Sequence, residues 1–349
     1  MEKLKIMVVD DSALMRKIIS DMINEENDME VVAVARDGEE LLTKLDKIKV
    51  DIITLDVEMP KMDGITALRK LKEKQTEVKV IMLSSLTTRS SSLTLECLDL
   101  GAAEFLAKPS GSISLDINNV KFELVSKIRM VSKIKKPLII PKKTIISERK
   151  KTEMPNRAVS NKRFEAVLIG ASTGGPKALY EVITALPEDL GVPVFVVQHM
   201  PKGFTKAFAE RLNNNSKLKV VEGAQNQNIE KNCVYIAPGG FHMEISKDKK
   251  ISLNEEPAIW GVRPAVDKLF ISAVEVYKGN LLSVVLTGMG RDGAKGTETV
   301  KDAGGYTISE DESTCTIYGM PKACFETGKV DEVIGLHDVS TAIIKLVKK

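Results

Sequence analysis

IGASTGGP, at residues 169–176, is the stretch that decides the fold of the second half of the chain. The apolar run at residues 166–169 predicts a strand, which enters a glycine-rich turn before a helix that begins near Pro176. The glycines permit a tight turn that projects Ser172, and the amides at the helix start can stabilise an oxyanion or bind phosphate. Two interpretations follow, a serine nucleophile or a nucleotide-phosphate loop. The second lacks both GxGxxG and the Lys and Ser or Thr of a Walker loop.

A serine nucleophile needs a base, and the chain has only three histidines. His199 ends the apolar run at residues 193–198, so in a parallel sheet it lies at the same edge as Ser172. His242 follows another strand-like run through Pro-Gly-Gly and is the second candidate. His337 precedes the final helical pattern and is expected to cap it.

The base in turn needs an orienting carboxylate. The apolar run at residues 281–286 is followed by TGMGRDG, which contains Asp292. Asp292 is the natural third member, and Asp267, on a helical pattern, is the competing carboxylate. The order Ser, His, Asp differs from the order Ser, Asp or Glu, His of α/β-hydrolases. The G-x-S-x-G match therefore does not assign the chain to that fold.

The first part of the chain also ends its predicted strands with polar residues. Five apolar runs alternate with helical spacing, which favours a parallel sheet with helices on both faces. The residues that follow these strands include Asp10, Asp11, Asp56, Ser84 and Lys108. Clustered carboxylates favour a hard cation such as Mg²⁺. We interpret Asp56 as a phosphoryl acceptor that binds the metal with Asp10 and Asp11, while Ser84 and Lys108 meet the phosphate oxygens.

A basic stretch separates the two parts. Residues 133–163 contain 11 Lys or Arg against two Glu, with three prolines and no sustained periodicity, which is typical of a linker. The predicted organisation is a first domain at 1–133, a basic flexible linker at 134–162 and a second domain at 163–349. Because the whole chain carries +3, the two folded parts together carry a net charge of −6.

The composition excludes several function classes. A chain of 349 residues with 43% hydrophobic and 28% charged residues is long enough for about two globular domains. No apolar run approaches the roughly 18 residues that span a bilayer, and no secretory signal opens the chain, so a cytoplasmic protein without membrane insertion is expected. The four cysteines form no CxxC pair, and the scattered aromatic residues give no platform for nucleic acid.

Four motifs of the first domain resemble the receiver domain of response regulators: VVDDS at 8–12, LDVEMPKMDG at 55–64, MLSS at 82–85 and AKPS at 107–110. The resemblance implies a flavodoxin-like sheet of strand order 2-1-3-4-5 and phosphotransfer from a histidine kinase to Asp56. It also places Phe105 at the position of an aromatic ring that often responds to phosphorylation. Ser84 stands where many receivers have Thr and keeps the hydroxyl.

Five blocks of the second domain resemble the catalytic domain of chemotaxis protein-glutamate methylesterases: IGASTGGP at 169–176, QHMPKGFT at 198–205, YIAPGGFHM at 235–243, RPAVDKLF at 263–270 and LTGMGRDGAKG at 286–296. The resemblance implies a Rossmann-like α/β esterase that uses Ser172, His199 and Asp292, with Thr173 and the Met289 amide as oxyanion donors. The implied reaction is hydrolysis of glutamate γ-methyl esters on the cytoplasmic helices of chemoreceptors, together with deamidation of receptor glutamines and no cofactor.

The same resemblance and the domain order imply control of the esterase. We expect the unphosphorylated receiver to pack over the Ser172 edge and phosphorylation of Asp56 to relieve that inhibition. Because the catalytic part is mildly acidic, Arg263 and Arg291 are expected to supply local contacts to an acidic receptor.

Two other classes of output domain were weighed. A DNA-binding output needs a small basic helix-turn-helix segment, whereas the second domain is long, strand-rich and acidic. A non-catalytic phosphate- or nucleotide-binding domain would leave His199 and Asp292 without roles.

Overall fold

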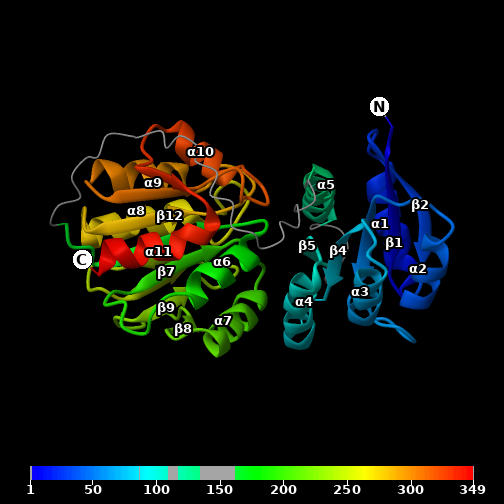
Figure 1. The fold of residues 1–349 in the computed structure, drawn as a ribbon, viewed down its shortest axis with the longest axis horizontal. Coiled ribbons are helices and arrows are strands. Elements are labelled where there is room, and N and C mark those ends of the chain that lie inside the picture. Colours follow the sequence, from blue (N-terminus) through cyan, green and yellow to red (C-terminus); the bar gives the residue numbers. More distant parts are fainter. Residues whose placement is uncertain (1, 86, 109–116, 134–161, 349) are drawn as a thin grey trace, which may run out of the picture.

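The computed structural model describes residues 2–85, 87–108, 117–133 and 162–348. Two α/β units follow one another along the chain, each built on a parallel sheet with helices on both faces (Figure 1). The first unit ends with a helix at Lys133, and the first strand of the second begins at Ala166. Most of the predicted linker at 134–162 lies outside the described residues.

The first unit has the strand order β2-β1-β3-β4-β5 with all neighbours parallel, which confirms the flavodoxin-like prediction. Alternate strand residues face opposite layers, so the inner strands β1, β3 and β4 are buried on both sides, whereas the edge strand β2 is only partly buried. One face packs on α1 and α5, and the other packs on α2, α3 and α4. The elements are β1 (Leu4–Val9), α1 (Ala13–Asn24), β2 (Met29–Ala35), α2 (Gly38–Leu45), β3 (Ile52–Asp56), α3 (Gly64–Glu73), β4 (Lys79–Ser84), α4 (Thr88–Leu100), β5 (Glu104–Ala107) and α5 (Ile117–Lys133).

The second unit has a seven-stranded sheet of order β14-β13-β12-β6-β7-β9-β8, again with parallel neighbours. Its elements are β6 (Ala166–Ala171), α6 (Gly175–Thr184), β7 (Val194–Gln198), α7 (Phe204–Asn215), β8 (Lys219–Glu222), β9 (Cys233–Ile236), β10 (His242–Ile245), β11 (Ile251–Asn254), α8 (Val266–Tyr277), β12 (Leu281–Val285), α9 (Ala294–Asp302), β13 (Tyr306–Glu310), α10 (Met320–Glu326), β14 (Glu332–Ile334) and α11 (Leu336–Val347). Helices α8 and α9 cover one face of the sheet, and α6, α7 and α11 cover the other (Figure 1). The Rossmann-like prediction is confirmed.

The strand order reverses at β6, and this reversal positions the site. The chain moves from β6 to β7 on one side and later returns to β12 on the other side of β6. In open α/β sheets a crevice forms at such a reversal, outside the carboxyl ends of the strands. Residues that follow β6, β7 and β12 therefore converge.

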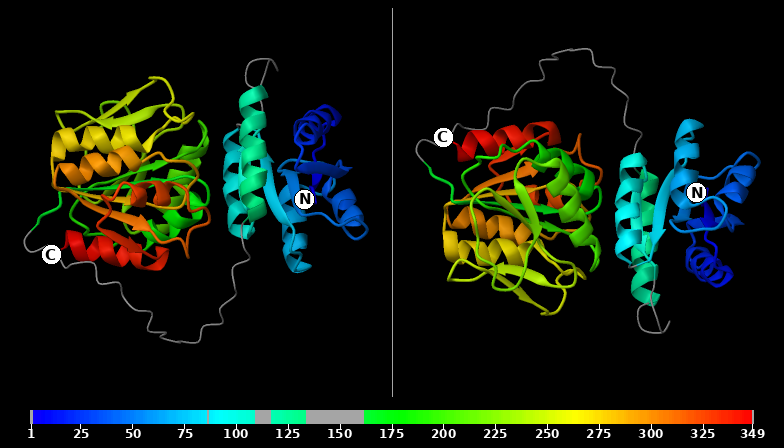
Figure 2. Two further views of the ribbon diagram at one scale, coloured as in Figure 1. Left: turned by 90° about the horizontal axis from the view of Figure 1, so that it is seen from above. Right: turned by 90° about the horizontal axis from the view of Figure 1, so that it is seen from below.

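The two units touch through α4 and β5 of the first and α6 and α7 of the second (Figure 2). Phe105 on β5 stacks on Phe204 at the start of α7, with ring centroids 4.8 Å apart, and both side chains are buried. Asp99 on α4 forms an ion pair with Arg211 on α7, whose guanidinium lies 5.5 Å from the centre of the Tyr180 ring. The hydrophobic core thus continues across the contact between the two units.

None of the described helices is both long and apolar enough to cross a bilayer.

The close approach of α8 and α9 generates a stability prediction. A Cβ at Gly296 would lie 2.6 Å from the Cβ of Phe270, which is bonded directly to the backbone and so cannot swing away. Overpacking of this kind costs about 1–3 kcal/mol, whereas Gly to Ala inside a helix gains only about 1 kcal/mol. We expect Gly296→Ala to lower the free energy of unfolding by up to about 2 kcal/mol, measured in denaturant by fluorescence of Trp260, the only tryptophan.

The matched control is Lys295→Ala, at an exposed neighbouring position of α9 that should change the free energy by less than about 0.5 kcal/mol. An unfolding midpoint of Gly296→Ala at or above the wild-type value would contradict the close packing of the two helices.

Candidate functional site

Ser172 lies directly after β6, in the turn that leads into α6. Its amide donates to the carbonyl of Thr287 at 3.0 Å, and its carbonyl accepts from the Gly175 amide at 2.7 Å. Gly174 has φ +76 and leaves no room for a Cβ, which would lie 2.4 Å from Thr316 Oγ1. Glycine is therefore required there by both conformation and space. The turn presents a half-buried Ser172 at the carboxyl edge of the sheet.

His199 and Asp292 follow the two strands that flank β6. The register pairs Ala171 with Gln198, so Ser172 and His199 are the next residues on adjacent parallel strands. His199 Nε2 lies 2.8 Å from Asp292 Oδ2. The structure describes both Ser172 and His199 and places no hydrogen bond between their side chains. It therefore forms the His–Asp half of the predicted triad and brings Ser172 to the same edge.

Asp292 is held as an anion by several donors. Besides His199, its oxygens accept the amides of Val266 at 2.6 Å and Asp267 at 2.9 Å, at the start of α8. Burial opposes ionisation, but the hydrogen bond and charge of His199 and these amides outweigh it and lower the pKa of Asp292. A carboxylate only accepts hydrogen bonds, so Nε2 of His199 carries the proton and Nδ1 is the basic nitrogen.

The competing candidates have other partners. His242 is fully buried, with Nδ1 accepting the Ala265 amide at 3.2 Å and Nε2 lying 3.1 Å from the Pro257 carbonyl. His337 pairs with Glu181 of α6, and the cap position of α11 is Gly335, so the prediction that His337 caps this helix is wrong.

Asp267 accepts the amides of Gly293 at 3.0 Å and Gly296 at 2.7 Å. Burial, followed by the charge of Asp292, raises the pKa of Asp267. It supports the loop that carries Asp292 and has no contact with His199.

The remaining sequence candidates lie around the same edge. Among the described residues, no acceptor takes the amides of Thr173 or Met289. A Cβ at Gly288 would lie 2.8 Å from Ser172 Cβ, so the loop before Met289 passes close to the serine. Arg263 donates to the carbonyls of Glu255 and Glu256 at 2.6 and 2.9 Å and thus holds a loop.

Arg291, the other arginine expected to contact a receptor, lies over the exposed ring of Trp260, with 5.1 Å between its guanidinium carbon and the ring centre.

Sequence reasoning missed a buried support beneath this edge. Glu310, at the end of β13, accepts the Thr287 amide at 2.7 Å and the Thr314 hydroxyl at 3.0 Å. Thr287 Oγ1 in turn lies 3.1 Å from the carbonyl of Thr173. Burial raises the pKa of Glu310. The only available signal was an acidic residue at the end of a predicted strand, which resembles the rule that identified His199.

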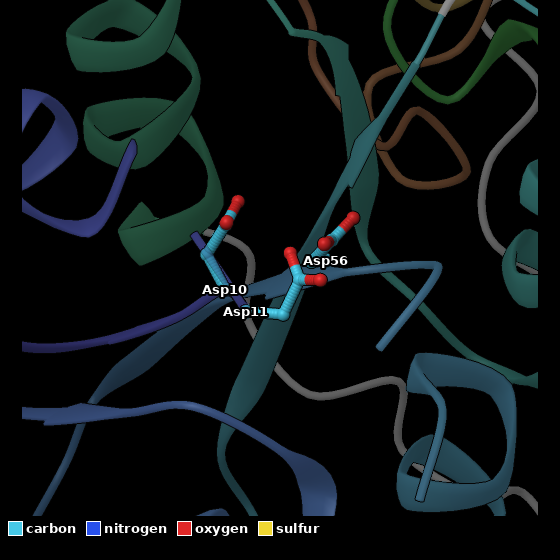
Figure 3. A group of neighbouring side chains, drawn as sticks. All are labelled: Asp10, Asp11 and Asp56. Carbon is cyan, nitrogen blue, oxygen red and sulfur yellow. The ribbon is translucent and has the colours of Figure 1, made fainter. Parts of the chain in front are cut away.

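In the first unit, Asp10, Asp11 and Asp56 converge as predicted (Figure 3). Each offers a carboxylate oxygen within 4.8 Å of the others. Lys108 Nζ lies 2.7 Å from Asp10 Oδ2 and 2.8 Å from Asp56 Oδ2. Burial raises the pKa of Asp56 to about 6 despite the opposing effect of Lys108. For Lys108, burial favours the neutral form, but the hydrogen bonds to Asp10 and Asp56 prevail and raise its pKa.

This acidic cluster fits a magnesium ion by its donor chemistry. Three carboxylates against one ammonium leave an excess of two negative charges when all three are ionised, and Mg²⁺ prefers carboxylate oxygens together with waters. The Arg16 guanidinium donates to the carbonyls of Asp10 and Asp11 at 2.6 and 3.0 Å and so holds the turn that carries them.

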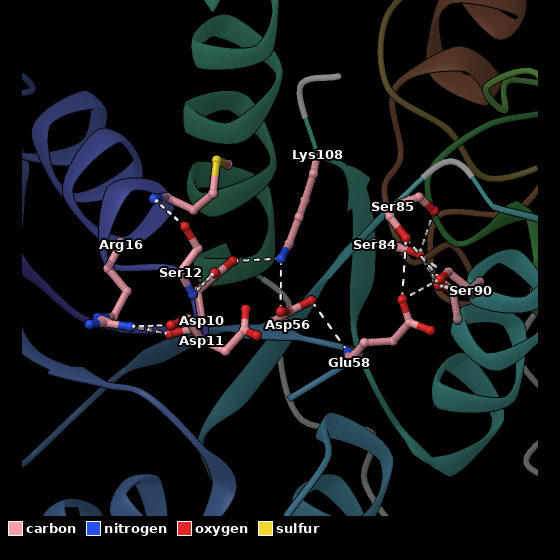
Figure 4. A network of polar contacts seen from close by, with 12 residues as sticks. Asp10, Asp11, Ser12, Arg16, Asp56, Glu58, Ser84, Ser85, Ser90 and Lys108 are labelled. Atoms are coloured by element: carbon pink, nitrogen blue, oxygen red, sulfur yellow. Dashed lines mark hydrogen bonds and ion pairs between the residues drawn. The ribbon is translucent and has the colours of Figure 1, made fainter. Parts of the chain in front are cut away.

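Ser84 does not face the acidic cluster in this structure (Figure 4). Its buried hydroxyl lies 3.3 Å from the Ser90 carbonyl and 2.7 Å from Thr94 Oγ1, both on α4. Glu58, which sequence reasoning did not single out, accepts a hydrogen bond from the Ser90 hydroxyl at 2.9 Å. Its amide lies 3.4 Å from Asp56 Oδ1. Two contacts thus link the loop after Asp56 to the start of α4.

Comparison with known proteins gives a family for each of the two units. The family model "CheB methylesterase" matches residues 167–343, and the model "Response regulator receiver domain" matches residues 6–117. A protein-glutamate methylesterase/protein-glutamine glutaminase of Clostridium acetobutylicum is 51% identical over 100% of this chain and 99% of its own length. One with the same name from Pyrococcus horikoshii is 42% identical over 99% of this chain and 94% of its own.

Among solved structures, the Thermotoga maritima CheB methylesterase catalytic domain is 43% identical and aligns with a TM-score of 0.51. The match covers 53% of this chain and 99% of that one. The matched families cover both α/β units in the order in which the sequence presents them. The chain therefore belongs to the CheB methylesterase family and carries a response regulator receiver domain before its catalytic domain.

Proposed function

We propose that this chain is a phosphorylation-controlled serine esterase that hydrolyses glutamate γ-methyl esters on chemoreceptors and deamidates receptor glutamines. The observation that carries the proposal is the placement of Ser172, His199 and Asp292 after β6, β7 and β12, at the reversal of the strand order. Curated relatives up to 51% identical over the whole chain are named for both activities. We propose that it acts in the cytoplasm, because its proposed substrates are the cytoplasmic helices of the receptors.

The reaction follows from the roles of the three side chains. Nδ1 of His199 takes the Ser172 proton as Oγ attacks the ester carbonyl, and Asp292 stabilises the resulting imidazolium through Nε2. The unpaired amides of Thr173 and Met289 are the proposed donors to the oxyanion. The imidazolium returns its proton to the departing methoxide, giving methanol and an acyl-enzyme. Water, deprotonated by His199, then releases the receptor glutamate. With a glutamine substrate the leaving group is ammonia.

We propose Asp56 as the phosphoryl acceptor for a histidine kinase, with Asp10, Asp11 and Asp56 as ligands for Mg²⁺. A bound Mg²⁺ would offset the charge of the incoming phosphoryl oxygens. Lys108, already within 2.8 Å of Asp56, would pair with one of those oxygens. Ser84 would reach another after leaving its partners on α4.

The receiver is proposed to restrain the esterase through the contact between the two units. Phe204 follows His199 by five residues, so the stack of Phe105 on Phe204 bears on the segment that carries the base. Release of Ser84 from α4 and movement of Phe105 would loosen this contact. The basic linker keeps the receiver attached while the contact opens.

The serine mechanism is tested with the full-length chain and methylated receptor. Ser172→Ala removes the nucleophile and should lower methanol release by roughly 10⁴-fold or more, since the remaining groups cannot form the acyl-enzyme. The control is Ser283→Ala, which removes a buried hydroxyl without a hydrogen-bond partner from neighbouring β12 and should leave the rate unchanged. Full activity in Ser172→Ala would exclude the serine mechanism, whereas no methanol release from the wild-type chain would favour the alternative, a non-catalytic phosphate- or nucleotide-binding output domain.

The acceptor site predicts a metal-dependent phosphotransfer. Asp56→Asn should abolish transfer of labelled phosphate from the kinase, and Asp11→Asn should slow it by about tenfold or more through loss of a ligand charge. A chelator should stop the wild-type reaction and added Mg²⁺ should restore it. The exposed Asp21→Asn variant on α1 serves as the control with a wild-type rate. Transfer that persists in Asp56→Asn would exclude this acceptor.

The contact between the units predicts a charge-reversal phenotype. Asp99→Arg places two guanidinium groups together and should raise the methanol release of the unphosphorylated chain about two- to tenfold, because an ion pair of this exposure contributes about 0–1 kcal/mol and its reversal adds repulsion. The double variant Asp99→Arg/Arg211→Asp should return to the wild-type rate. Equal unphosphorylated rates in all three chains would disprove a restraining role for this pair.

A further inference from the structure

We propose that Gln198 is a positioning residue of the esterase: its carboxamide ties the backbone of the nucleophile to the backbone of the base. This inference rests on the proposed function. Gln198 is the last residue of β7, immediately before His199, and its side chain is 2% exposed. The mechanism above gives it no role, although it is the polar end of an otherwise apolar strand.

The carboxamide contacts both catalytic residues. Gln198 Nε2 lies 2.9 Å from the Ser172 carbonyl and 3.1 Å from the His199 carbonyl. The amide nitrogen has two hydrogens, one for each carbonyl. The assignment of nitrogen and oxygen follows from these partners, because the opposite orientation would point the carboxamide oxygen at two carbonyl oxygens.

Among the residue types, only glycine at position 175 leaves room for the Gln198 carboxamide. A Cβ at Gly175 would lie 2.0 Å from Gln198 Oε1, so any other residue at 175 would displace the carboxamide. The Gly175 amide donates to the same Ser172 carbonyl at 2.7 Å. Ser172 is thus fixed at its carbonyl by the start of α6 and by Gln198, and at its amide by Thr287.

Gln198 connects two segments that the side chains of Ser172 and His199 do not join directly. No hydrogen bond joins the side chains of Ser172 and His199, which the structure describes in full, so their relative position depends on the backbone of β6 and β7. A main-chain hydrogen bond also joins these two strands: the His199 amide donates to the Ala171 carbonyl at 3.1 Å. Gln198 is buried and neutral, so it provides two donors without the cost of a buried charge.

The experiment compares kcat and KM for methylated receptor in full-length Gln198→Met and Gln198→Glu, with the receiver phosphorylated. Met keeps the volume and removes both donors, and we expect kcat to fall about 10- to 100-fold with KM within about threefold of wild type. The matched control is Thr307→Val, which removes a buried hydroxyl that donates to the Lys329 carbonyl at 2.6 Å, at the opposite end of the sheet from the site. It should lose stability and keep kcat.

Gln198→Glu adds a readout that a purely structural role would not move. A buried carboxyl between two carbonyls donates one hydrogen bond when protonated and repels both when ionised. The ratio of its kcat to the wild-type kcat should rise several-fold as the pH falls from 8.5 to 6, whereas the ratio for Gln198→Met should stay constant. Taking ratios cancels any pH dependence that the variant shares with the wild-type chain.

The proposal is overturned if Gln198→Met keeps kcat within twofold of wild type, or if its loss appears in KM alone. It is equally overturned if Gln198→Glu and Gln198→Met give parallel pH profiles. Failure of the proposed function is distinguishable, because the wild-type chain itself would then release no methanol.

Discussion

The carboxyl edge of the parallel sheet is the constraint on which the second domain depends. The strand order reverses at β6, so the turns after β6, β7 and β12 must meet, and each carries one member of the Ser172, His199 and Asp292 set. The sheet below is apolar on both faces, which leaves this edge as the place where polar groups gather. Asp292 keeps its charge there because two amides of α8 and the His199 ring outweigh its burial.

In the receiver domain, polar residues also gather at the carboxyl ends of the strands, but they form a cluster with a different chemistry. Its strand ends gather carboxylates and one ammonium, and burial raises the pKa of Asp56 to about 6. Asp56 and Asp292 both follow apolar strands, yet their pKa values move in opposite directions. Asp292 accepts two backbone amides and a ring N–H, whereas Asp56 lies beside the like charge of Asp10 and shares the Lys108 ammonium with it. The two environments thus shift the pKa values of these two buried carboxyl groups in opposite directions.

The sequence alone predicts the features of the fold that the periodicity of the strands determines. Both sheets, and the residues that end their strands, follow from apolar runs and from the parallel arrangement. The orientation of Ser84 toward α4, the stack of Phe105 on Phe204 and the role of Gln198 do not, since each depends on which neighbour a side chain meets. His337 shows the same limit: its position near a helix start suggested a cap, but a partner on α6 determines its contact. Such contacts link segments far apart in the sequence, and periodicity carries no information about them.

The free energy of the contact between the two units is of the size expected for a switch. An aromatic pair contributes about 0.5–1.5 kcal/mol beyond its burial, and an exposed ion pair contributes about 0–1 kcal/mol. A hundredfold change in a two-state population needs about 2.7 kcal/mol. The Phe105 stack and the Asp99 ion pair together contribute at most about 2.5 kcal/mol, slightly less than that value. A phosphoryl group at Asp56 adds close to two negative charges at the end of β3, which only β4 separates from the β5 strand of this contact. A much larger interface would keep the esterase closed after phosphorylation, and a much smaller one would leave it open before.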